Sequence, residues 1–274
     1  VVGAGMAGLA CEKAVLQAGV EGIGDPYLPS AGNGGYEALH YEIVLEFDPD
    51  SGAIAGLATI DCLAQQDLRS FNLDLSGLEV NAITVDGRTA EHRRKGEELV
   101  ISCPQTLVSG AEFTVEVAYS GRPEPVRDAD LFWLGWLQVG NYVYTLDEPL
   151  GAATWYPVND HPSDKATYTF RVTVPKPYTA VANGVLVETI DQGGKRTFVW
   201  EMRQALASYL AAVSIGEYEL EESEAPNGVL IRNYFASGLA GKAPPLFAPT
   251  ADMIAYFAEQ FGPYPFEAYG VVVP

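Results

Sequence analysis

Residues 165–175 read KATYTFRVTVP and alternate apolar with polar side chains along the whole stretch. The apolar positions are Tyr168, Phe170, Val172 and Val174, and the polar positions are Thr167, Thr169, Arg171 and Thr173. Successive side chains of a β-strand point to opposite faces, so this pattern predicts a strand with one buried and one solvated face.

The same alternation recurs on both sides of this stretch. From residue 36 onward one face carries Tyr41, Ile43, Leu45 and Phe47. Strand-like segments follow at 51–64, 70–87, 97–104, 112–121 and 195–202, with Gly, Asp or Pro between them. This rhythm is typical of antiparallel meanders, and it predicts a large all-β sandwich or saddle.

Two local patterns break this rhythm. Asn183-Gly184 lies between strand-like segments and predicts a tight type I′ hairpin, because this turn needs two positive φ angles. Near the end, Ile254, Phe257, Ala258 and Phe261 follow helical spacing, and the pattern stops at Gly262-Pro263.

The three valines at 271–273 then predict a strand buried on both faces, as in a sheet that helices cover. We therefore expect a thermolysin-like α/β domain to begin near residue 238 and to be present only as a truncated start, one helix and one strand.

Charge limits the partners. The 36 acidic and 16 basic residues give a net charge of −20, which repels nucleic acid and anionic lipid surfaces. The same field favours a cationic substrate or a peptide ammonium group, although solubility alone is an alternative explanation. No apolar run reaches the roughly 18–20 residues of a membrane-spanning helix. The compartment stays open between the cell surface or secretion and the cytoplasm.

The amino terminus carries a glycine pattern, Gly3-x-Gly5-x-x-Gly8, which resembles the FAD-binding opening of flavin amine oxidases. Only Val1 and Val2 precede the glycines, where a whole strand is required. The acidic partner of the ribose could only be Glu21 or Asp25, and neither closes a strand. We interpret residues 1–24 as a leader, a signal or an expression remnant, and keep FAD binding as a less favoured alternative.

The central stretch 141–184 carries a family resemblance. Glu148-Pro149, then 155–157 (WYP), then Asp160-x-Pro162-x-x-Lys165-Ala166-Thr167 resemble the E-P, [FY]-P and D-x-P-x-x-K-A-T pattern of aminopeptidase N-type zinc metallopeptidases. These are the gluzincins of the membrane alanyl aminopeptidase family. Residues 24–48 and 256–273 resemble the start of that family's β domain and the entry to its catalytic domain. The resemblance implies a β domain over 25–237 and the beginning of a zinc peptidase domain over 238–274.

The resemblance implies that Glu148 binds the substrate. In the family the glutamate of the E-P motif holds the free α-ammonium of the peptide. An ionised carboxylate does this through a short charge-assisted hydrogen bond, which also fixes the distance to the scissile carbonyl. A solvated loop carboxylate is the alternative. Family members often carry Gln two residues earlier, where this chain has Leu146, so its side-chain preference is open.

A metal site in this chain is not expected. Asp160, His161 and Asp164 could suggest one, but they lie among turn-forming residues, where a carboxylate more often caps backbone amides or pairs with Lys165. The only histidines are His40, His92 and His161, and no H-E-x-x-H helix is present.

We therefore predict no catalytic residue and no cofactor in this chain. Zinc is expected in a full-length parent that removes N-terminal residues from peptides, and this chain alone is expected to be inactive. Its partners would be the peptide N-terminus and its own missing catalytic domain. The alternative is a non-catalytic β-sandwich module that binds another protein or serves as a scaffold.

Overall fold

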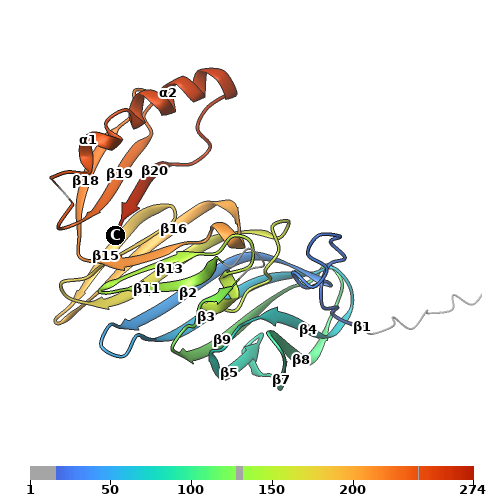
Figure 1. Cartoon of the computed structure of the whole chain (residues 1–274). Helices are drawn as coiled ribbons and strands as arrows, with labels where there is room; N and C mark the ends of the chain where they lie inside the picture. The colour runs from blue at the N-terminus through green and yellow to red at the C-terminus, as the bar shows by residue number, and fades with distance from the viewer. Residues whose placement is uncertain (1–16, 128–131, 240) are drawn as a thin grey trace, which may run out of the picture.

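The computed structural model describes residues 17–127, 132–239 and 241–274, and its centre is an eight-stranded sheet (Figure 1). Neighbouring strands follow the order β15 (Val185–Gln192), β16 (Lys195–Ala207), β13 (Lys165–Pro175), β2 (Tyr36–Asp48), β3 (Ala53–Ala64), β9 (Glu112–Gly121), β5 (Glu79–Val85) and β6 (Arg88–Thr89). All neighbours are antiparallel except β13 and β2, which run parallel with Phe170 opposite Ile43. The predicted strand at 165–175 is therefore confirmed. The glycine motif at Gly3, Gly5 and Gly8 lies outside the described residues.

Two smaller sheets pack on the large one. The first has the order β1 (Gln17–Ala18), β4 (Leu68–Asp74), β8 (Glu98–Leu107) and β7 (His92–Lys95). The second has the order β10 (Val126–Arg127), β11 (Trp133–Val139), β12 (Tyr142–Leu146), β17 (Val213–Gly216) and β14 (Thr179–Ala182). One continuous core takes side chains from all three sheets, which confirms the predicted β-sandwich.

The alternating face of β13 lies at the centre of this core. Its inward residues, from Tyr168 to Val174, are at most 1% exposed, and the Tyr168 ring stacks on Tyr41 with centroids 5.1 Å apart. Full burial of one such side chain is worth about 1.5–3 kcal/mol. The period-two pattern therefore holds this strand in one register, because a shift by one residue would bury the threonines instead.

The predicted hairpin at Asn183-Gly184 is wrong. β14 ends at Ala182 and pairs with β17, whereas β15 begins at Val185 and pairs with β16 in the large sheet. Of the two turn residues only Gly184 has a positive φ, 83°, so the turn is not type I′. The Asn183 side chain bonds the connector at Leu210 and Ala212 instead. Asn-Gly here forms a corner between two sheets.

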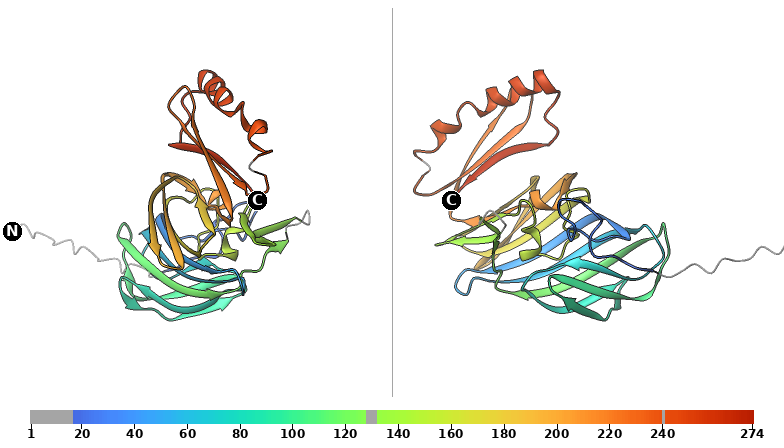
Figure 2. Two further views of the ribbon diagram at one scale, coloured as in Figure 1. Left: turned by 90° about the vertical axis from the view of Figure 1, so that its left-hand side faces the viewer. Right: turned by 45° about the vertical axis from the view of Figure 1, so that its right-hand side comes forward.

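A separate three-stranded sheet follows the sandwich in sequence. It contains β18 (Tyr218–Glu224), β19 (Leu230–Ala236) and β20 (Ala268–Val273), and β20 runs parallel to β19. The helices α1 (Pro244–Phe247) and α2 (Thr250–Phe261) lie on the face of this sheet that points away from the sandwich, as Figures 1 and 2 show. No helix in the described residues is long and apolar enough to cross a membrane.

The α2 helix matches the predicted one but leaves most of its apolar residues in solvent. Ile254 is buried against β19, whereas Phe257 and Phe261 are 54% and 84% exposed. The helix ends as predicted at Gly262, whose N–H donates to the Ala258 carbonyl. The predicted valine strand is present as β20. Its valines are only half-buried, because β19 is its one strand partner in the described part of the chain.

Candidate functional site

Glu148 lies on an exposed turn at the end of β12. β12 itself is held between β11 and β17, so the strand that leads to the turn is paired on both edges. The peptide bond from Glu148 to Pro149 is cis. Leu146, which stands where relatives with the E-P motif often have Gln, is 48% exposed on the same strand end.

Asp147 points the opposite way from its two neighbours and is only 3% exposed. The indole Nε1–H of Trp155 donates to its Oδ2 atom at 3.0 Å, and the Gly151 N–H donates to its backbone carbonyl at 2.7 Å. Burial raises the pKa of the Asp147 carboxyl well above its ordinary value. Sequence reasoning missed this residue, although two adjacent acids at the end of a strand are the one signal that pointed to it.

The rest of the turn is packed tightly against β11. The 3₁₀ helix η1 (Ala152–Thr154) follows the turn, and the Thr154 hydroxyl donates to the Gly151 carbonyl at 2.7 Å. The same hydroxyl accepts the Trp136 N–H at 3.1 Å. A Cβ atom on Gly151 would lie 2.6 Å from the Gly135 nitrogen, so only glycine fits there. The turn that carries Glu148 is thus fixed by buried contacts.

The other polar residues of the motif are not brought together. The Asp160 N–H donates to Asp74 at 2.9 Å, and Asp160 Oδ1 accepts the hydroxyl of Ser208, in the 3₁₀ helix η2 (Ser208–Leu210), at 2.7 Å. Asp164 turns the other way and accepts the Ala38 N–H at 3.1 Å. This amide cap is what the sequence predicted for Asp160 or Asp164, and Asp164 provides it.

His161 contacts the amino-terminal segment instead of either acid. Its Nε2 atom lies 3.6 Å from Asp25 Oδ2, and its Nδ1 atom lies 2.8 Å from the Ser163 hydroxyl. Asp25 also caps the N–H groups of Tyr27 and Leu28. Lys165 is exposed at the start of β13. Within the described residues no group of three His, Cys, Asp or Glu side chains could hold a metal ion.

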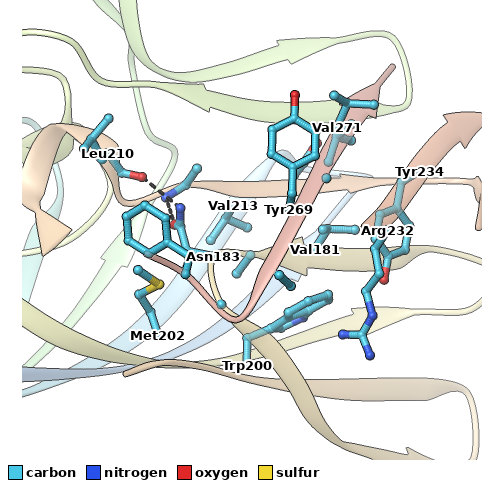
Figure 3. A pocket seen from close by; sticks show the side chains of 18 of the residues that line it. Val181, Asn183, Trp200, Met202, Leu210, Val213, Arg232, Tyr234, Tyr269 and Val271 are labelled. Atoms are coloured by element: carbon cyan, nitrogen blue, oxygen red, sulfur yellow. Dashed lines mark hydrogen bonds between the residues drawn. The ribbon is translucent and has the colours of Figure 1, made fainter. Parts of the chain in front are cut away.

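A cavity of about 630 Å³ opens between the sandwich and the C-terminal sheet (Figure 3). Its apolar walls include Val181, Trp200, Met202 and Val213 on one side and Tyr269 and Val271 of β20 on the other. Glu148 is not among the residues that line this cavity, but Tyr144 and Thr145 of the same strand are.

The fold and the motif together define a class, the amino-terminal β domain of a zinc metallopeptidase. Residues 37–210 match the Peptidase M1 N-terminal domain. This match covers more than half of the chain, and the chain therefore belongs to that family.

Relatives and solved structures agree with this assignment. The chain is 27% identical to leukotriene A-4 hydrolase of Xenopus laevis over 253 residues, which are 87% of this chain and 40% of the relative. It is 26% identical to probable aminopeptidase 1 of Sulfurisphaera tokodaii over 193 residues, 69% of this chain and 23% of that protein. The M1 zinc metallopeptidase of Deinococcus radiodurans has a TM-score of 0.85 and 30% identity, covering 92% of this chain and 59% of the peptidase.

The matched relatives are longer than this chain. The chain spans less than two thirds of the length of each of these three relatives. A mutant of the Deinococcus peptidase has been solved with a Tyr-Ser-Ala substrate, and its TM-score to this chain is 0.84.

Proposed function

We propose that this chain is the substrate-binding, amino-terminal domain of a zinc-dependent aminopeptidase, and that Glu148 binds the α-ammonium group of the peptide. The observation that carries the proposal is the position of Glu148. Its carboxylate is exposed, yet the turn beneath it is held by the buried pair Asp147 and Trp155. A carboxylate on a fixed support can set the distance from the ammonium to the scissile bond.

Charge supports the same ligand. An ionised carboxylate forms its strongest hydrogen bonds with a charged donor such as an ammonium group. The net charge of −20 adds a long-range attraction for a cationic peptide end. The substrate solved with the Deinococcus relative is a peptide, Tyr-Ser-Ala.

The residues that the structure describes do not fit a zinc site. The sequence has three histidines, and the described residues hold no cluster of metal ligands. No step of the hydrolysis is therefore assigned to this chain, which we expect to be inactive alone. In the proposed parent, zinc would be held elsewhere and would supply the activated water.

We propose that the zinc-bearing part packs on the C-terminal unit. Met253, Phe257 and Phe261 form an apolar stripe on α2 and are each more than half exposed. Apolar residues that recur along one helix face usually meet a partner surface. In the sheet of this unit, β18 and β19 precede residue 238 and β20 follows it, so the sheet crosses the predicted boundary. The division into 25–237 and 238–274 remains a prediction.

The ligand role of Glu148 is tested with isotope-labelled protein and a tripeptide amide. Addition of the free-amine peptide is expected to shift the amide resonances of residues 145–148 and of Leu150, with an affinity in the millimolar range. The N-acetylated peptide is expected to leave these resonances in place, because acetylation removes the charged donor. Glu148→Gln keeps the shape of the side chain and is expected to abolish the response to the free amine. Equal shifts with both peptides would contradict the proposal and favour a general binding module.

The absence of catalysis is tested separately. The purified chain is expected to release no product from aminoacyl anilides, with or without added zinc, because it lacks the ligands that would activate water. Turnover that disappears on addition of a chelator would overturn this expectation.

A further inference from the structure

The direction of Glu148 depends on the direction of its neighbour Asp147. At the end of β12 the exposure of successive side chains alternates, with Leu146 outside, Asp147 inside and Glu148 outside. β12 ends at Leu146, and Glu148 is the first residue of the turn. Because Glu148 directly follows Asp147, the contacts that hold Asp147 in the core also restrict where the Glu148 side chain can point.

Three contacts hold Asp147. The Trp155 indole donates to its carboxylate, and the Gly151 N–H donates to its backbone carbonyl. In addition, a Cβ atom on Gly151 would lie only 2.7 Å from the Asp147 Cα atom, so the two segments are in close contact. A residue with this many anchors has little freedom to rotate its backbone.

The donor of the side-chain bond is itself immobile. Trp155 is fully buried, and its ring lies 4.3 Å from the Tyr156 ring and 6.3 Å from the Trp136 ring, measured between centroids. An indole in such an aromatic cluster cannot turn to find another acceptor. The bond to Asp147 is thus an anchor with a fixed end in the core.

We infer that Asp147 is a positioning residue for substrate binding: by accepting the Trp155 indole hydrogen bond in the core, it holds the Glu148 carboxylate toward the peptide ammonium. This inference rests on the proposed function of Glu148 and adds a second residue to that site. Asp147 does not contact the substrate.

The surroundings of the Asp147 carboxyl group suit a residue that positions Glu148. Its Oδ1 atom is buried and has no hydrogen-bond partner in the part of the chain that the structure describes. Burial raises the pKa of the carboxyl well above its ordinary value, and nearby Asp160 adds to the effect. A carboxyl group that is harder to ionise competes less with Glu148 for the peptide ammonium.

Two variants separate the hydrogen bond from simple packing. Asp147→Asn keeps an acceptor for the indole and has no charge, whereas Asp147→Leu has a similar volume and no acceptor. We expect Asp147→Asn to retain the amine-dependent shifts of the original chain. We expect Asp147→Leu to weaken peptide binding roughly tenfold, the effect of losing about one ordinary hydrogen bond.

Two spectroscopic readouts report on the anchor directly. In Asp147→Leu the Trp155 indole proton resonance is expected to move, and the backbone order parameter of Glu148 is expected to fall below the rigid range of about 0.85. Trp155→Phe removes the same bond from the other side, and it should produce the same loss of order at Glu148. If Asp147→Leu fails to fold, Trp155→Phe provides the same test of the hydrogen bond.

The outcomes are distinct. The inference would be overturned if a folded Asp147→Leu chain kept the peptide affinity and the Glu148 order parameter of the original chain. It would also be overturned if Asp147→Asn lost them. If the original chain shows no amine-dependent shift, the proposed function of Glu148 fails and the inference fails with it. In that case the order parameters still show whether Asp147 holds the turn.

Discussion

Replacing Gly184 with alanine is expected to lower the free energy of unfolding by at least about 4 kcal/mol, among the largest effects of a single substitution. Gly184 has φ of 83°, a region that costs a non-glycine residue about 1–3 kcal/mol. In addition, an added Cβ atom would lie 1.9 Å from the Glu201 carbonyl oxygen. That oxygen belongs to the backbone of β16, which is paired with β15 on one side and β13 on the other, so it cannot move aside cheaply.

Gly193 offers a matched control for this substitution. Its φ is 71°, close to that of Gly184, but a Cβ atom there would have no neighbour within 4 Å. Gly193→Ala is therefore expected to cost only about 1 kcal/mol, the backbone contribution alone. Urea denaturation followed by tryptophan fluorescence measures both values. Equal losses for the two variants would show that the steric contact at the sheet corner has no effect.

Stability is expected to fall steeply as the pH rises from about 4 to 8. The cause is a set of four buried or partly buried carboxyl groups, those of Asp74, Glu98, Asp160 and Asp164. Burial raises the pKa of Asp160 and that of Asp164 to about 7. Asp74 and Glu98 lie close together, and burial raises the pKa of each, with mutual repulsion adding to the effect at Glu98.

The sign follows from proton linkage. Each of these acids has a higher pKa in the folded chain than in the unfolded chain. Between these two values the folded chain retains protons that the unfolded chain has released, and the free energy of unfolding decreases with pH. One unit of pKa shift corresponds to about 1.4 kcal/mol for a single group. With several groups involved, we expect a total loss of several kcal/mol, which continues as the pH rises through about 8, the pKa of Glu98.

Asp160→Asn tests the contribution of one member of the set. Asparagine can still accept the Ser208 hydrogen bond, and it is neutral at every pH. The variant is expected to match the original chain below about pH 4, where Asp160 is protonated in both the folded and the unfolded chain, to exceed it in stability at pH 8, and to have a shallower slope between. Urea midpoints across this range provide the measurement. A stability that rises from pH 4 to pH 8 in the original chain would contradict the buried, protonated state of these acids.

The sequence was sufficient for the central strand, the C-terminal helix and the motifs, although the local pattern at Asn183-Gly184 misled. Period-two alternation identified β13 and its buried face, and helical spacing with Gly262 identified α2 and its end. The ordered E-P and D-x-P-x-x-K-A-T motifs were enough to suggest the family that the comparisons confirmed. These features are readable because each is encoded by neighbours along the chain.

Part of the candidate site was readable in the same way. The E-P motif pointed to Glu148, and the structure adds that its carboxylate is exposed at the end of β12. The residue beneath it was not readable. Nothing near Asp147 in sequence indicates that its acceptor would meet the indole of Trp155, eight positions later.

Only the tertiary structure decided how distant segments meet. It made Asn183-Gly184 a corner between two sheets, placed β13 parallel to β2, and sent Asp160 and Asp164 to different partners. It also left Phe257 and Phe261 exposed, because β19 contacts only one side of α2. Each of these outcomes is set by packing between residues far apart in sequence. A local sequence pattern does not indicate which distant surface will pack against it.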